Sequence, residues 1–156
     1  SLAFFVRREL SFSLLGLYIL AQCVGGLLGS GLAHLMFEVP FIQISGTTRF
    51  GPSQWLSESV ATFALLAAIF GCVRFNPSAV PYAVGLVITA GYWWTSSTSF
   101  ANPAVTLARG FTDTFAGIRP TDVPVFIAVQ MATAVLSTWI FIWLLREEAD
   151  ESPDRA

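Results

Sequence analysis

The stretch that decides the fold is Asn102-Pro103-Ala104-Val105-Thr106-Leu107-Ala108-Arg109-Gly110-Phe111. Asn is among the best helix N-cap residues and Pro is favoured at the first helical position, so a helix is predicted to begin here. It follows an apolar segment, 78–95, but is too short to cross a bilayer. If it begins at membrane depth, its positive end points into the bilayer. Irregular backbone at that depth is tolerated only inside protein or along a cavity, which favours a channel or a transporter.

The composition is that of an integral membrane protein. Of the 156 residues, 54% are hydrophobic and 12% are charged, and the mean hydropathy is +0.67, whereas soluble domains carry about 25% charged residues. The formal net charge is −2 and the sequence has no basic patch, so we expect no nucleic-acid partner. Cys23 and Cys72 lie in apolar segments and are interpreted as small core residues. His34 is the one histidine, so we expect no metal site of clustered histidines and no cofactor.

Four segments are long enough to span a membrane, which takes about 20 apolar residues per crossing. They are residues 10–36, 55–73, 78–95 and 123–145. With the half-helix at 102–111 they form one expected transmembrane domain, 1–145. The remainder, 146–156, is polar and charged and is expected to be a disordered tail. Because the chain begins at Ser1 in what reads as the end of an element, we expect a fragment whose N-terminal part is missing.

The placement of arginines predicts a cytoplasmic start and a cytoplasmic tail. If the first span runs outward, five arginines lie inside, two lie outside, and Arg109 lies at the end of the half-helix. The inside set is Arg7, Arg8, Arg74, Arg146 and Arg155, and the outside set is Arg49 and Arg119.

An internal repeat relates the first span to the fourth. Residues 18–26 and 126–134 both place an aromatic-Ile pair ahead of a glutamine and then small residues. Since these spans run in opposite directions, the match favours an inverted repeat, with chance similarity as the alternative. Gln22 and Gln130 are interpreted as structural, helix-packing groups rather than solute ligands.

The chain resembles the aquaporin (major intrinsic protein) family. The resemblance rests on Asn102-Pro103-Ala104, Tyr18-Ile19-Leu20-Ala21-Gln22 and Glu58-Ser59-Val60-Ala61-Thr62, and with the span order it covers nearly the whole chain. It implies an all-α membrane protein, a right-handed helical bundle with a re-entrant half-helix. The four spans would be the third to sixth of six transmembrane helices, and 102–111 the second of two half-helices.

The resemblance also implies roles for the residues around the half-helix. Asn102 would donate from its side-chain amide to a passing solute oxygen, while the half-helix dipoles oppose a cation. Its alternative is an ordinary N-cap in a loop. Pro103 would rigidify the turn, and Ala104 would allow close approach to the other half-helix. Glu58 would bond loop backbone and hold the half-helix loop; its alternative is a position near the membrane surface.

The selectivity filter departs from the family pattern. The family usually carries Arg directly after the second Asn-Pro-Ala, and Val105 stands there in this chain. Arg109 lies one turn later and need not reach the constriction. Tyr92 matches the filter position of the fifth helix and Ser99 that of the loop, while Thr106 stands where glycerol-conducting members often have Asp. We therefore expect a wide constriction without the usual arginine.

The implied function is a passive channel for water or small uncharged solutes, such as glycerol or metalloid acids like arsenous acid. The resemblance implies a homotetramer in the lipid bilayer of a bacterial plasma membrane. No phosphate-binding loop or nucleophile arrangement indicates an enzyme. The alternatives are a secondary transporter with a broken helix, in which Glu58 or His34 would couple ions, and a truncated product that does not conduct.

Overall fold

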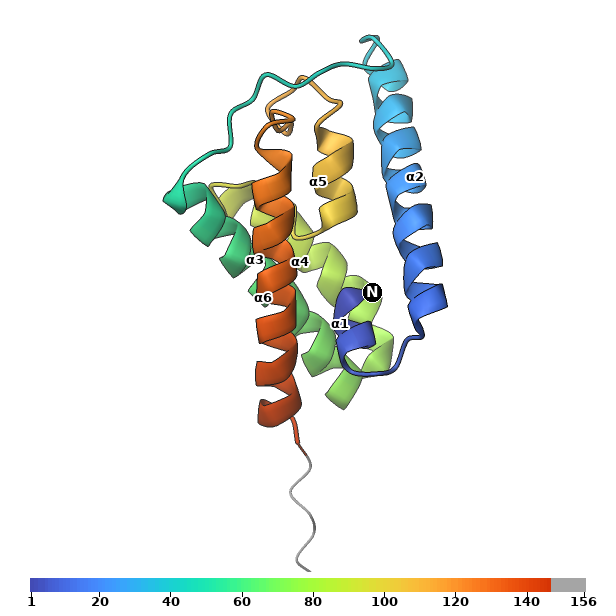
Figure 1. The fold of residues 1–156 in the computed structure, drawn as a ribbon, viewed down its shortest axis with the longest axis vertical. Helices are drawn as coiled ribbons and strands as arrows, with labels where there is room; N and C mark the ends of the chain where they lie inside the picture. The colour runs from blue at the N-terminus through green and yellow to red at the C-terminus, as the bar shows by residue number, and fades with distance from the viewer. Residues whose placement is uncertain (147–156) are drawn as a thin grey trace, which may run out of the picture.

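Residues 1–146 are described by the computed structural model, and over this range the chain is α-helical without a strand (Figure 1). The helices are α1 (Leu2–Val6), α2 (Phe12–Met36), α3 (Pro52–Phe75), α4 (Val80–Trp94), α5 (Pro103–Arg109) and α6 (Val123–Leu144), with a 3-10 turn at Pro77–Ala79. The predicted all-α class is confirmed. Apart from Arg146, the expected polar tail lies outside the described residues.

Three of the described helices, α2, α3 and α6, are long and apolar enough to cross a membrane. They coincide with the predicted spans 10–36, 55–73 and 123–145. The segment 78–95 differs, because its first residues form the 3-10 turn and only the 15 residues of α4 are α-helical. At 1.5 Å per residue α4 is about 22 Å long, less than the roughly 30 Å of a hydrocarbon core. A crossing by 78–95 thus stays a prediction.

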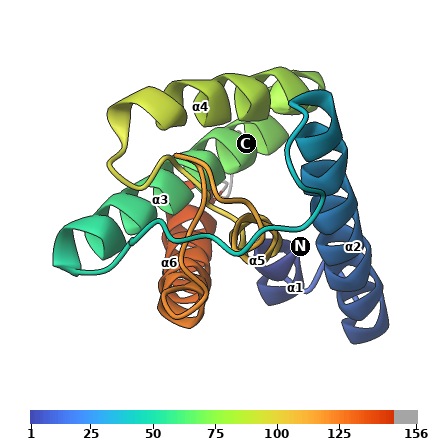
Figure 2. The same ribbon diagram turned by 90° about the horizontal axis from the view of Figure 1, so that it is seen from above.

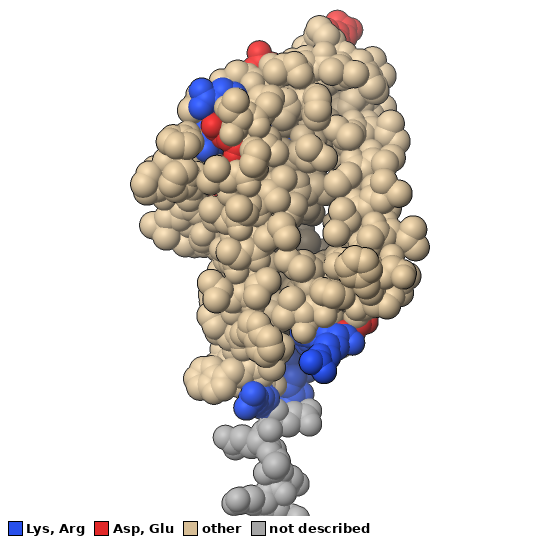
Figure 3. Space-filling view, in the orientation of Figure 1, with Lys and Arg blue, Asp and Glu red and all other residues tan. Residues whose placement is uncertain are grey.

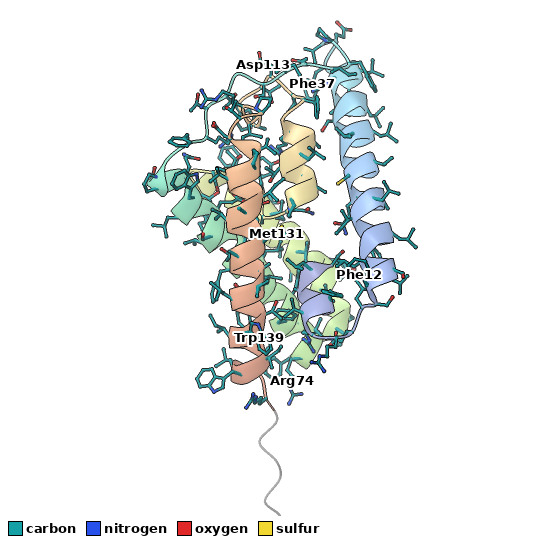
Figure 4. All side chains as sticks on the ribbon, viewed as in Figure 1. Phe12, Phe37, Arg74, Asp113, Met131 and Trp139 are labelled. Carbon is teal, nitrogen blue, oxygen red and sulfur yellow. The ribbon has the colours of Figure 1, made fainter. Side chains whose placement is uncertain are left out.

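The surface of the helices suits a lipid environment. On the face shown in Figure 3, charged side chains gather at the two ends of the molecule, with an uncharged belt between them. Large apolar side chains stand outside the bundle: Trp139, which lies toward the C-terminal end of α6 (Figure 4), is 58% exposed. Exposed apolar surface of this extent is unfavourable in water and marks a membrane-contacting surface.

The short helix α5 lies near the centre of the bundle, between α2 and α6 (Figures 1 and 2). It packs on both of these helices, while α3 packs on α4 and α6, and α1 packs on α6 and α2. One apolar cluster, Ala3, Leu66, Phe70 and Phe141, joins α1 to α3 and α6. A second cluster, Phe100, Ile118, Val123 and Phe126, lies beneath the loops that flank α5.

Gly26 allows α2 and α5 to approach closely. A Cβ atom on Gly26 would lie 3.3 Å from the Cβ of Ala108 and 3.5 Å from the carbonyl oxygen of Ala104. Membrane helices use small residues to bring backbones together in this way. The packing of the half-helix on α2 therefore depends on the absence of a side chain at position 26.

We expect Gly26→Val to destabilise the protein by about 1–3 kcal/mol, because its methyl groups push α2 away from α5. The measurement is the midpoint of thermal unfolding in detergent. Gly16→Val is the control, since no atom lies within 4 Å of a Cβ atom on Gly16. Equal shifts for the two variants would contradict close packing at Gly26.

Candidate functional site at the half-helix

Asn102 begins α5 as its N-cap and keeps its amide nitrogen free. Its side-chain Oδ1 accepts a hydrogen bond of 2.9 Å from the Ala104 amide, which satisfies one of the unpaired N–H groups at the helix start. Among residues 1–146, Nδ2 of Asn102 has no protein acceptor, so both of its N–H donors are available to another molecule. The cap thus fixes the side chain and leaves a donor at the start of the half-helix.

The loop before Asn102 has an unusual backbone. Thr98, Ser99 and Ala101 adopt φ angles of 58°, 50° and 49°. These angles lie in the left-handed region of backbone conformation, which residues other than glycine rarely adopt. Such residues cost on the order of 1–3 kcal/mol each and persist only where the surroundings hold them. Part of the anchoring comes from Ser57, whose hydroxyl accepts a 3.2 Å hydrogen bond from the Ser97 amide.

The carboxylate of Glu58 on α3 binds two backbone amides of this loop. Its side chain is fully buried and accepts hydrogen bonds from the amides of Ala101 and Phe100, the latter at 3.3 Å. It also accepts a 2.7 Å hydrogen bond from Nε2 of Gln130 on α6. A carboxylate with three donors is the arrangement that makes a buried charge tolerable. The structure thus places Glu58 beneath the loop, in the bundle interior.

Gln130 joins Glu58 to the half-helix. Besides its bond to Glu58, its Nε2 donates to the Thr106 hydroxyl at 2.7 Å, so one glutamine ties α6 to both α3 and α5. Gln22 makes the matching contact in the first half of the chain, donating from Nε2 to the Ser1 hydroxyl at 2.8 Å. Gln130 therefore bonds a hydroxyl within the short helix α5, and Gln22 bonds the hydroxyl of the N-cap of the short helix α1. Each short helix packs on the helix of its glutamine.

Sequence reasoning missed that the repeat includes the start of the chain. Ser1-Leu2-Ala3 matches Thr106-Leu107-Ala108, and the hydroxyl residue precedes its glutamine by a similar interval in the two halves. This similarity is visible in the sequence, but a match of three residues is evidence for a repeat only when a contact in the structure supports it. The paired contacts of Gln22 and Gln130 provide that support for an inverted repeat.

The three predicted filter residues lie in different surroundings. Val105 is half-buried and packs on the cluster around Phe100. Ser99 is buried against Gly91, and its hydroxyl has no hydrogen-bond partner among the described residues. Tyr92 lies under the guanidinium group of Arg109, whose Cζ atom is 5.1 Å from the ring centroid. Arg109, which on the sequence interpretation need not reach the constriction, thus contacts one of the predicted filter residues.

Arg49 organises the connections at the same end of the bundle. Its buried side chain donates 2.7 Å hydrogen bonds from Nε to the Gly117 carbonyl and from Nη2 to the Phe115 carbonyl. Its amide donates to Asp122 at 2.9 Å. Burial lowers the pKa of Arg49, and the Glu58 carboxylate opposes that shift. No local sequence pattern marks Arg49, because its partners lie about 70 residues away.

Two further polar contacts hold these connections. Burial raises the pKa of Asp122, but hydrogen bonds from the Arg49 amide and the Arg119 side chain outweigh it and lower that pKa below its ordinary value. The buried His34 ring bonds the Phe41 carbonyl through Nδ1 and the Thr112 hydroxyl through Nε2, both at 2.8 Å. His34 therefore ties the end of α2 to the segment that follows α5.

The central half-helix, the buried carboxylate under its loop and the three long apolar helices indicate an integral membrane protein built around a re-entrant segment. The resemblance to the aquaporin, or major intrinsic protein, family that was drawn from the motifs is confirmed by a curated relative. The chain is 50% identical over 146 residues to the aquaglyceroporin AqpS of Rhizobium meliloti (strain 1021), covering 94% of this chain and 63% of that relative. The chain thus spans just under two thirds of the length of this curated relative. No family model matches the chain, and no solved structure matches it.

Proposed function

We propose that the full-length protein is a passive channel for water and small uncharged solutes. The observation that carries the proposal is the free Nδ2 donor of Asn102, held at the start of a half-helix by the loop that Glu58 anchors. A donor fixed in this way can replace one hydrogen bond of a passing water or hydroxyl group. Because transport then needs no conformational cycle, the flux follows the concentration or osmotic gradient.

The proposed barrier to ions has an electrostatic origin. The N-terminus of α5 carries the positive end of the helix dipole, so a cation near Asn102 meets an unfavourable field while a neutral solute does not. In the proposed channel, Pro103 and Ala104 shape the turn at the start of α5. Gln22, Gln130 and Glu58 keep structural roles and do not bind solute.

Glycerol and metalloid acids are the proposed solutes besides water. The relative in Rhizobium meliloti is named an aquaglyceroporin, which supports glycerol. Val105 adds no donor and no charge at a position where the family usually carries Arg, so a filter formed with Tyr92 and Ser99 would be wide. Arsenous acid resembles glycerol in presenting several hydroxyl groups on a small neutral body, and we include it on that ground.

The proposed setting is a bacterial plasma membrane, with the C-terminal tail in the cytoplasm and a homotetramer as the assembly. The domain would comprise spans at 10–36, 55–73, 78–95 and 123–145 and the half-helix at 102–111. An enzymatic role is not proposed.

The test is stopped-flow light scattering on liposomes that contain the full-length protein. We expect water, glycerol and arsenous acid each to cross faster than in protein-free liposomes, with rates independent of proton and sodium gradients. Flux that requires either gradient would instead support the secondary transporter. Rates equal to those of protein-free liposomes for all three solutes would support a non-conducting product.

A further inference from the structure

We propose that Arg109, fixed beside Arg49, supplies the positive charge of the pore at the far end of the half-helix and excludes cations there. The inference rests on the proposed channel function and adds a residue that determines its selectivity. Position 105, where the family usually carries Arg, is an uncharged valine in this chain. Another group is therefore needed to discriminate against cations by its charge.

The geometry first shows two guanidinium groups on one aromatic ring. The Cζ atoms of Arg49 and Arg109 lie 5.0 Å and 4.9 Å from the ring centroid of Phe100, and Arg109 is also 5.1 Å from the centroid of Tyr92. Each distance is within the range of a cation–π interaction. Arg109 is therefore held between a ring of the loop before Asn102 and a ring of α4, next to the predicted filter.

The charges at this place do not cancel. Among residues 1–146, neither Arg49 nor Arg109 forms a salt bridge. Asp122 is paired with Arg119 at 3.0 Å. The Glu58 carboxylate interacts electrostatically with Arg49 and Arg109, but its oxygens accept hydrogen bonds from the loop and from Gln130. Two cations face one carboxylate, which leaves one positive charge in excess.

The two arginines differ in what they can offer a solute. Arg49 is 5% exposed and gives Nε and Nη2 to loop carbonyls, so it serves the structure of the loops. Arg109 is half-buried and makes one hydrogen bond to the described residues, from Nη1 to the Ala116 carbonyl at 3.0 Å. Four of its five N–H donors remain without a protein acceptor there. The charge of Arg109 is thus less enclosed by protein donors and acceptors than that of Arg49, and it can repel a cation that approaches it.

The charge of Arg109 lies only a short distance along α5 from position 105, where the family usually carries its arginine. Arg109 follows Val105 by four residues, which is one helical turn and about 6 Å along the axis. A purely structural explanation is that Arg109 complements the negative end of the α5 dipole. A positive charge placed at position 105, on the first turn, cannot do this. A rescue experiment at position 105 can therefore separate the two roles.

The experiment compares the full-length wild type with Arg109→Gln, the double variant Val105→Arg/Arg109→Gln and the control Arg119→Gln, all in liposomes. Arg119 suits the control because it is another arginine at this end, 44% exposed and paired with Asp122. Sodium entry is read with a trapped sodium-sensitive dye under an inward Na⁺ gradient, and osmotic water permeability is read in the same vesicles. Wild-type water permeability tests the proposed function, and the ratio of sodium leaks tests this inference.

We expect Arg109→Gln to raise the sodium leak about tenfold while water permeability stays within about twofold of wild type. We expect the double variant to return toward the wild-type leak and Arg119→Gln to match the wild type. A leak of Arg109→Gln equal to that of the wild type, or a double variant as leaky as Arg109→Gln, would overturn the proposal. If Arg109→Gln does not fold, Arg109→Met replaces it, because Met keeps an apolar stem between the two rings. The same criterion then applies to the ratio of its sodium leak to that of the wild type.

Discussion

Replacement of Glu58 by Gln is expected to lower the midpoint of thermal unfolding in detergent by about 5–10 °C. The Glu58 carboxylate accepts from the amides of Phe100 and Ala101 and from Gln130. A Gln side chain has one acceptor oxygen and turns an NH₂ group toward the remaining donors. At least one buried donor then loses its partner, at about 1–3 kcal/mol for each. The left-handed residues before Asn102 lose their main anchor as well, so flux should also fall.

Glu38→Gln is the matched control, because it removes a carboxylate from an exposed position in a turn after α2. We expect its unfolding midpoint to stay within about 2 °C of wild type, as for most surface substitutions. If Glu58→Gln shifted the midpoint no more than Glu38→Gln, the carboxylate would not hold the loop.

The second large effect is expected from Val105→Arg. It should reduce glycerol and arsenous acid permeability by about tenfold and water permeability much less, because a long cationic side chain narrows the constriction and adds donors that suit water. The measurement is stopped-flow light scattering with each solute. Val105→Leu adds bulk without charge, so it separates the effect of a narrower constriction from the effect of the added charge and donors.

A different outcome would remove Val105 from the selectivity argument. If the wild type passes water alone and Val105→Arg changes none of the permeabilities, position 105 does not set selectivity. Val105 is half-buried against the cluster around Phe100, so a substitution there can also lower the amount of folded protein. The amount of protein in each liposome sample is therefore measured as a control.

The parts of the fold that local chemistry determines could be predicted from sequence. The start of α5 followed from an N-cap residue and a proline, and three long helices followed from the length of their apolar segments. The α-helix in the segment 78–95 is shorter than the apolar length of the segment. Pro77 precedes the segment and Pro81 lies near its start, where a 3-10 turn leads into α4.

The candidate site was less accessible to sequence reasoning. The role implied for Glu58 came from a motif, but the left-handed residues Thr98 and Ala101 carry no local signal, since neither is glycine. The stacking of Arg109 on Tyr92 and Phe100 depends on how α4, α5 and the loop between them pack. Contacts between elements of this kind follow from tertiary packing rather than from spacing along the chain.

Asn102→Ser is the most direct test of the channel proposal, because Ser retains an N-cap acceptor for the Ala104 amide and replaces the two Nδ2 N–H donors with one hydroxyl donor on a shorter side chain. Osmotic water permeability is measured in liposomes with equal amounts of folded wild type and variant. We predict that wild type exceeds protein-free liposomes and that Asn102→Ser is several-fold slower than wild type. Wild-type permeability no higher than that of protein-free liposomes, or an Asn102→Ser variant as fast as wild type, would contradict a pore that passes solute along Asn102.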